Sequence, residues 1–256
     1  MPLLEIINLT HRFAGLCAVS DFSFTVKPQE LIGIIGPNGA GKTTVFNLIT
    51  GVYRASEGNI KLSGRELVGL TPHQITSLGI ARTFQNIRLF RELSVLDNIR
   101  IAHYGQIAYT PIEALLHIGR FRTEENRITT QSLDLLSIFN LDDASGEKAK
   151  NLPYGLQRRL EMARALATKP KLLLLDEPAA GMNPNEILQL MDLIHWIRKT
   201  FSVTIILIEH QMRLVMGICE RLVVLDFGAN IAAGLPAEIQ TNPKVMEAYL
   251  GEEVTS

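Results

Sequence analysis

The chain has 256 residues, of which 46% are apolar and 20% are charged, and its formal net charge is −1. This length and apolar content suffice for a globular domain with a sizeable core. The balanced charge excludes a global basic field that would hold the protein on nucleic acid or on an anionic membrane, so we expect no nucleic-acid partner.

The N-terminal segment predicts strands rather than a targeting or membrane sequence. It lacks the basic and apolar regions of a signal peptide, and no later segment reaches the roughly 18 apolar residues of a membrane-spanning helix. We therefore expect a cytoplasmic protein. Residues 4–13 and 21–28 have β-like composition and are expected to pair antiparallel. The two cysteines, Cys17 and Cys219, have no metal-ligand spacing and are expected to fill the core.

A phosphate-binding loop follows the next predicted strand. The apolar run LIGII at residues 31–35 precedes GPNGAGKTT, and VFNLITG then predicts a helix that ends near Gly51. This loop satisfies the pattern G-x-x-x-x-G-K-[ST] in its required context between a strand and a helix. Its backbone amides can bind phosphate, Lys42 supplies a positive charge, and Thr43 supplies a hydroxyl for Mg²⁺. The predicted nucleotide-binding residues here are Gly36, Pro37, Asn38, Gly39, Ala40, Gly41, Lys42, Thr43 and Thr44.

The middle of the chain is predicted to be helical. Ser94 with Asp97 resembles a capping box, and residues 113–121 and 129–141 have helical spacing. We expect a helical subdomain over about residues 86–168, inserted into an α/β core.

Two carboxylates follow a buried strand in the second half of the chain. Residues 171–175 and 203–208 are apolar runs typical of central strands in a parallel sheet. Asp176 is the candidate metal-side acid, and Glu177 is the candidate base that polarises a water molecule. Asn183 is expected to cap the following helix. Near the C-terminus, RLVVLDFGANIAAG predicts a hairpin that turns at Phe227 and Gly228.

Five motifs in this order resemble the ATP-binding subunits of ABC transporters: GPNGAGKTT, TFQ, YGLQRR, LLLLDEP with AAGMNP, and IEH. The resemblance implies an ABC ATPase fold, with a mostly parallel P-loop core, an N-terminal antiparallel β subdomain and the helical insert, in one ATP-binding domain over residues 1–256. It implies ATP and Mg²⁺ as cofactors. It gives Gln85 a role at Mg²⁺ or the attacking water, and His210 a contact with the γ-phosphate. Phe13 matches the aromatic residue that stacks on adenine, with a core position as the alternative.

The segment LPYGLQ resembles the signature motif usually written LSGGQ. Pro153 replaces the serine and Tyr154 replaces the first glycine, whereas Gly155 and Gln157 are retained. Gly155 lies at the predicted start of a helix, where free N–H groups can bind a phosphate without a hydroxyl. We therefore expect Tyr154, Gly155 and Gln157 to contact the nucleotide that a partner subunit binds. Arg158 and Arg159 are interpreted as a solvated helix face.

The altered signature, AAGMNP, TFQNIRLFRELSV and the ending PKVMEAYLG are similar to the ATPase subunits of branched-chain amino acid importers. The last of these predicts a short helix that ends at Gly251. The resemblance implies a second ATPase subunit (a heterodimer, or alternatively a homodimer), two membrane permease subunits and an external solute-binding protein, at the cytoplasmic face of the inner membrane. Importers of urea or short-chain amides and an exporter such as that of lipopolysaccharide are the alternatives. Leu89 and Phe90 are predicted either to contact a membrane subunit or to pack within the helical insert.

Overall fold

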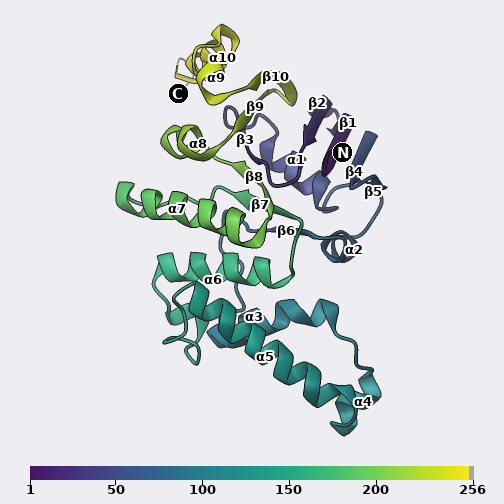
Figure 1. Cartoon of the computed structure of the whole chain (residues 1–256). Helices are drawn as coiled ribbons and strands as arrows, with labels where there is room; N and C mark the ends of the chain where they lie inside the picture. The colour runs from purple at the N-terminus through teal and green to yellow at the C-terminus, as the bar shows by residue number, and fades with distance from the viewer. Residues whose placement is uncertain (254–256) are drawn as a thin grey trace. The chain divides into compact units, whose positions relative to one another are not determined.

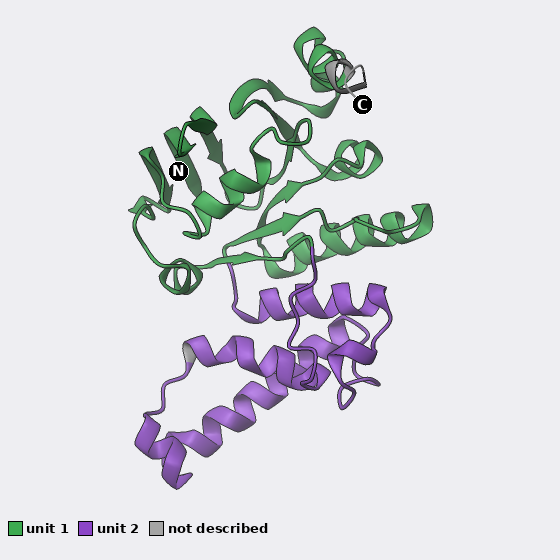
Figure 2. Ribbon diagram, turned by 180° about the vertical axis from the view of Figure 1, so that it is seen from behind, with its two compact units in different colours: residues 1–85, 171–256 green, residues 86–170 purple. Residues whose placement is uncertain are grey.

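The computed structural model describes residues 1–253, and the side chains of all of these except residues 106 and 250–253. The chain divides into two units: residues 1–85 with 171–253, and residues 86–170 (Figure 2). Residues 86–170 interrupt the first unit along the chain, as expected for an inserted helical segment. The prediction of a single ATP-binding domain over residues 1–256 stays a prediction.

The first unit contains a six-stranded, mostly parallel sheet (Figure 1). Its inner strands are almost entirely apolar and buried, which is typical of strands covered on both faces. In spatial order the strands are β10 (Ala229–Gly234), β9 (Arg221–Asp226), β3 (Leu31–Ile35), β8 (Thr204–Ile208), β7 (Leu172–Asp176) and β6 (Ile80–Arg82). All neighbouring pairs are parallel except β10 with β9. This sheet confirms the predicted P-loop core.

The register of the sheet places the functional segments at one edge. Ile208 pairs with both Ile34 and Asp176, so the ends of β3, β8 and β7 are level. The loops that follow these strands therefore leave the sheet side by side. Ligands of open α/β folds bind beyond the carboxyl ends of parallel strands, and this edge is the expected place for the site.

A second, antiparallel sheet confirms the prediction for the N-terminal residues. Its order is β2 (Leu16–Val26), β1 (Leu4–Phe13), β4 (Glu57–Leu62) and β5 (Arg65–Glu66). The predicted hairpin at β9 and β10 is also confirmed. It turns at Phe227 (φ 44°) and Gly228 (φ 80°), two positive φ angles that a type I′ turn requires.

Helices lie between the strands of the first unit or follow the last of them. They are α1 (Lys42–Ile49), α2 (Pro72–Ser77), α7 (Pro184–Phe201), α8 (Met212–Ile218), α9 (Pro236–Gln240) and α10 (Pro243–Glu253). Asn183 caps α7 as predicted, and its Oδ1 accepts the amides of Asn185 and Glu186. The prediction that the last helix ends at Gly251 is wrong, because α10 continues to Glu253.

Helices α3 (Val95–His103), α5 (Arg120–Ile138) and α6 (Tyr154–Ala167) pack on one another in the second unit (Figure 1). Ser94 caps α3 through the amide of Asp97. The prediction of a continuous helix over residues 113–121 is wrong. The short α4 (Pro111–Leu116) ends at His117 in the left-handed conformation, and α5 begins only after Gly119.

The two cysteines differ in burial. Cys219 lies in the core, but Cys17 is only half-buried because it lies toward the start of β2, so the core prediction is wrong for Cys17. Burial raises the pKa of the Cys219 thiol far above its usual value.

Within residues 1–253, none of the helices combines the length and apolar character needed to cross a membrane.

Candidate nucleotide-binding and catalytic site

The phosphate loop closes around the side chain of its own lysine. Lys42 is buried at the start of α1, and its Nζ donates to the carbonyl oxygens of Gly36 and Pro37, both at 2.7 Å. These bonds hold the ammonium group across the loop. The exposed Thr43 and the half-buried Thr44 follow in the first turn of α1. The amides of this turn and the lysine are the donors that a polyphosphate needs.

Glycine is required at two positions of this loop. Gly36 has φ +146° and Gly41 has φ +99°, which side-chain-bearing residues rarely adopt. A Cβ at Gly36 would overlap the carbonyl oxygen of Leu225, and one at Gly41 would lie 2.5 Å from that of Ala18. Glycine is therefore needed at these two positions for close approach to neighbouring backbone as well as for the positive φ angles.

Asp176 is paired with an arginine that the sequence interpretation missed. The Arg82 guanidinium lies 2.6 Å from Asp176 Oδ2, and both side chains are about 5% exposed. Arg82 also donates to Asn47 Oδ1 at 2.7 Å and lies over the rings of Phe46 and Phe84. The sequence feature that could have indicated this role is the position of Arg82 at the end of β6, three residues before Gln85. The pair fixes the carboxylate at the end of β7.

Glu177 lies at the centre of a polar cluster. Gln85 Nε2 donates to Glu177 Oε2 at 2.6 Å, and His210 Nδ1 is 3.8 Å from the same oxygen. Glu177 itself has φ +45°, and its amide donates to the Ile208 carbonyl at 2.9 Å. The structure thus brings together Gln85, Glu177 and His210, which the sequence predicted separately. Their roles toward a nucleotide remain predictions.

Phe13 lies on a half-exposed aromatic surface rather than in the core. It is 40% exposed and makes edge-to-face contacts with His11 (4.5 Å) and Tyr53 (5.2 Å). The alternative that Phe13 is a core residue is therefore wrong. An accessible ring supported from its edges can stack on a planar base.

The segment that resembles the signature begins helix α6 as predicted. Pro153 is the N-cap residue, and its side chain accepts no hydrogen bond from the first amides of α6. Tyr154 and Gly155 are exposed, and a Cβ at Gly155 would meet nothing within 4 Å. Gln157 Nε2 donates to the carbonyl of Leu152 at 2.8 Å and so braces the turn before the helix.

The interpretation of Arg158 as a solvated residue is wrong. It is 1% exposed, pairs with the buried Glu161 at 3.1 Å, and donates to the Tyr154 hydroxyl at 3.0 Å. Helical spacing places residues 158, 161 and 162 on one face of α6, and all three are buried there. Arg159, by contrast, is only half-buried.

The segment before α3 presents Phe90 at the surface. Buried Asn98 bonds both the amide (2.9 Å) and the carbonyl (3.0 Å) of Phe90, which fixes the backbone. The ring is 49% exposed and lies beside the Arg164 guanidinium. Leu89 is half-buried. This geometry favours the contact interpretation for Phe90, which remains a prediction.

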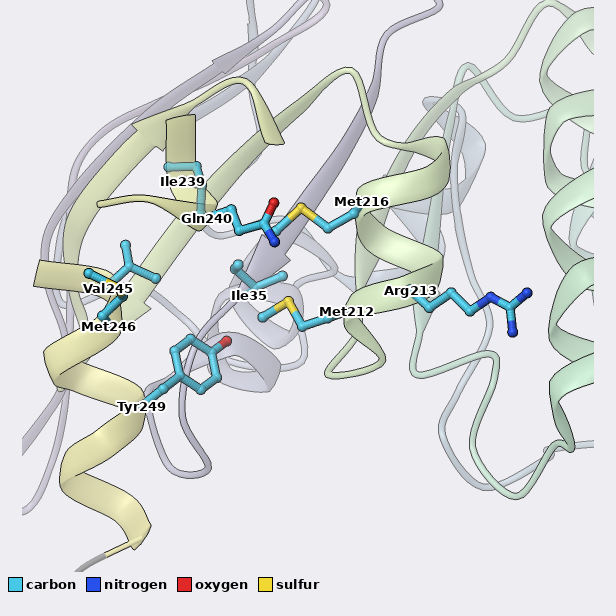
Figure 3. A pocket seen from close by; sticks show the side chains of 9 residues that line it. All are labelled: Ile35, Met212, Arg213, Met216, Ile239, Gln240, Val245, Met246 and Tyr249. Atoms are coloured by element: carbon cyan, nitrogen blue, oxygen red, sulfur yellow. The ribbon is translucent and has the colours of Figure 1, made fainter. Parts of the chain in front are cut away.

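Described residues of the first unit line at least two cavities. One, of about 680 Å³, lies against Pro37, Asn38, Gly39 and Ala40 of the phosphate loop and is bounded by the exposed Phe227. The other, of about 400 Å³, lies between α8 and α10 (Figure 3). It is mostly apolar, and its methionines are Met212, Met216 and Met246, whereas Arg213 points away from it.

The oxygen donors near the loop suit a hard cation. Thr43 offers a hydroxyl and Asp176 a carboxylate, which are ligand types that Mg²⁺ prefers. Among residues 1–253, no group of three or more histidine, cysteine or carboxylate side chains forms a protein-only metal site. Mg²⁺ commonly completes its shell with water and phosphate oxygens, so it does not need a site made of protein ligands alone.

Comparison with known families decides what this geometry represents. The family model described as "ABC transporter" matches residues 19–180, which include the loop, Asp176 and Glu177. The chain belongs to the ABC transporter family. A second model, "Branched-chain amino acid ATP-binding cassette transporter", matches residues 229–255 of this cassette.

Relatives place the cassette in the same branch. It is 45% identical over 251 residues to the "High-affinity branched-chain amino acid transport ATP-binding protein LivG" of Escherichia coli, and each chain is 98% covered. It is 44% identical, at the same coverage, to the corresponding protein BraF of Pseudomonas aeruginosa. The "Lipopolysaccharide export system ATP-binding protein LptB" of Acidithiobacillus ferridurans is 34% identical.

Solved structures confirm the fold. The crystal structure of the ADP conformation of MJ1267, an ATP-binding cassette of an ABC transporter, matches with a TM-score of 0.84 at 29% identity. The alignment covers 98% of this chain and 99% of that one. The predicted ABC ATPase fold is therefore confirmed.

Proposed function

We propose that this cassette binds and hydrolyses ATP as the ATP-binding subunit of an importer of branched-chain amino acids. One observation carries the hydrolytic part of the proposal: Gln85, Glu177 and His210 converge within hydrogen-bonding distance or close to it. They do so at the sheet edge where the phosphate loop begins. A base, an orienting amide and an imidazole beside a phosphate cradle are suited to attack by water on a γ-phosphate.

Each residue has a separate task in this proposal. Lys42 and the amides of residues 36–44 bind the phosphates, and Phe13 stacks on the adenine ring. Thr43, Asp176 and Gln85 hold Mg²⁺, which neutralises charge on the phosphates when bound. Glu177 accepts a proton from the attacking water, Gln85 orients that water, and His210 donates toward the γ-phosphate. Arg82 keeps the Asp176 carboxylate facing the site.

The signature segment supports the proposal of a partner. The start of α6 has no side-chain cap, and Gly155 there is exposed with open space around its Cα; a helix start of this kind can bind a phosphate. We propose that Tyr154, Gly155 and Gln157 bind the nucleotide held by a second ATPase subunit. Closure of the pair on ATP and its release after hydrolysis would then drive the membrane subunits.

The proposed solute follows from the names of the C-terminal family model and of the similar proteins. Both the C-terminal family model and the relatives that are 44–45% identical carry the name branched-chain amino acid transport. The identity to an export ATPase is lower, 34% against 44–45%, which favours import over export. We further propose two membrane permeases, an external solute-binding protein and a position at the cytoplasmic face of the membrane. The urea and short-chain amide importers remain the second candidate.

The proposal is tested with the assembled transporter reconstituted in lipid vesicles. Wild type is expected to hydrolyse ATP and to accumulate labelled leucine only when ATP is present on the cassette side. Glu177→Gln should lower hydrolysis by about 10²- to 10⁴-fold, the usual contribution of a general base, while ATP still binds. Glu147→Gln, at an exposed glutamate of the second unit, is the matched control. Hydrolysis by Glu177→Gln at the wild-type rate would refute the assigned base, and uptake of urea in place of leucine would refute the solute.

A further inference from the structure

Glu209 is a buried carboxylate that lies between two catalytic segments. It directly follows β8, immediately before His210, and it is 0% exposed. Its Oε1 accepts the amide of Ala179 at 2.8 Å. Its Oε2 accepts the amides of His210 at 3.0 Å and Gln211 at 3.2 Å. One side chain therefore satisfies three backbone donors.

These donors belong to two loops that are far apart in the sequence. Ala179 lies two residues after Glu177, in the turn that follows β7, whereas His210 and Gln211 form the turn that follows β8. A backbone bond also joins these two segments, because the Glu177 amide donates to the Ile208 carbonyl at 2.9 Å. The Glu209 carboxylate thus fixes the distance between the backbone of Glu177 and that of His210.

The location of Glu209 is costly for a carboxylate. Among the described residues, no lysine or arginine forms an ion pair with it, and burial raises its pKa despite the three amides. An apolar side chain would avoid this desolvation but would leave buried amides without acceptors. A buried carboxylate at this point is therefore explained by the geometry that it imposes.

We propose that Glu209 is a positioning residue that clamps the β7 and β8 turns, so that Glu177 and His210 face the same reacting phosphate. This inference rests on the proposed function, because it assumes that Glu177 and His210 act on ATP. Glu209 does not touch the nucleotide. Its effect is exerted through the backbone of the two residues that do.

The proposal predicts that catalysis and phosphate-loop binding respond differently to substitution. A misplacement of about 1 Å in a catalytic site can lower the rate about 100-fold. In the assembled transporter, Glu209→Ala should lower kcat by about this factor. ADP lacks the γ-phosphate, so its affinity for the full-length chain reports on the phosphate loop and should stay within about twofold. Glu209→Asp keeps the charge but is one methylene too short to reach both turns, and its kcat should fall similarly.

Two further variants separate positioning from stability. Glu209→Gln has the same length and keeps one acceptor oxygen, so it should fold and recover part of the kcat lost in Glu209→Ala. Glu66 is a matched control, because it also accepts three amides, those of Ile60 (3.1 Å), Leu67 (3.2 Å) and Val68 (3.0 Å). It lies on the antiparallel sheet. Glu66→Ala should lower the melting temperature but leave kcat within about twofold.

The outcomes are distinguishable. Wild-type kcat in Glu209→Ala or, if that variant does not fold, in Glu209→Gln would overturn the inference. Parallel losses of kcat, ADP affinity and melting temperature in the Glu209 variants would also overturn it, because they indicate a general structural role. A wild-type transporter that does not hydrolyse ATP would refute the proposed function itself, independently of Glu209.

Discussion

Substitution of Gly155 separates the folding of this cassette from its action on a partner's nucleotide. Gly155 is the second residue of α6, it is exposed, and a Cβ there would meet nothing within 4 Å. Its own chain therefore gives no reason for glycine. Aspartate at the start of a helix interacts favourably with the helix dipole, by about 0.3–1 kcal/mol. Gly155→Asp should accordingly leave the free energy of unfolding unchanged or raise it.

The same substitution should be severe if α6 binds a phosphate of the partner's nucleotide. Two unit charges about 4 Å apart near a protein surface repel by about 4 kcal/mol. Every 1.4 kcal/mol corresponds to a factor of ten, so this repulsion lowers the population of the closed, phosphate-bound state about a thousandfold. We expect the ATPase rate of the assembled transporter to fall by a factor of this order.

The assay compares steady-state ATP hydrolysis by the complex with the melting temperature of the chain. Gly146→Asp is the matched control, since Gly146 is also exposed, belongs to the same unit and has no atom within 4 Å of an added Cβ. This control should retain the wild-type rate. Wild-type hydrolysis by Gly155→Asp would refute the signature assignment, and a lowered melting temperature would refute the view that the chain tolerates aspartate there.

Three further predictions follow from other regions. Arg158→Met should lower the free energy of unfolding by about 3–5 kcal/mol, because it breaks a buried ion pair by removing the guanidinium that lies against the buried Glu161. Arg159→Met should change the free energy of unfolding by under about 0.5 kcal/mol in denaturant titrations. Equal effects of the two substitutions would contradict the difference in burial. Phe90→Ala should reduce leucine uptake per ATP hydrolysed without changing the melting temperature, and a lowered melting temperature would indicate a core role. Burial and the hydrogen bond to Glu125 raise the pKa of Tyr109 from 10 to about 12. The neutral phenol therefore contributes fully to the free energy of unfolding below pH 10, and this contribution is lost as the pH rises toward 12. In pH-dependent unfolding, Tyr109→Phe should lose less stability over this interval, and identical losses would contradict the raised pKa.

Much of the site was predictable because it depends on local patterns. The strand, loop and helix around Lys42 follow from an apolar run, glycines and a helical stripe. The predicted and observed strand ends agree within about one residue at β3, β7 and β8. The parallel order of these strands then places Asp176 beside the phosphate loop without further information.

What sequence reasoning missed depends on tertiary packing. Arg158 and Arg159 are identical residues side by side, and only the way α6 packs on its neighbours decides which is buried. Arg82 and Glu209 likewise have no motif of their own. Their roles became visible when their partners, Asp176 and the turn at Ala179, were located at distant positions of the chain.

The most direct test of the central claim is the equilibrium binding of ATP with Mg²⁺ to the purified full-length chain. The structure predicts saturable binding by wild type, and a large loss in Lys42→Ala, because Lys42 is the cation that the phosphate loop encloses. Lys61→Ala, on the antiparallel sheet, should bind as wild type does. Absence of saturable binding by wild type, or equal affinity in Lys42→Ala, would contradict the assignment of this loop as the nucleotide site.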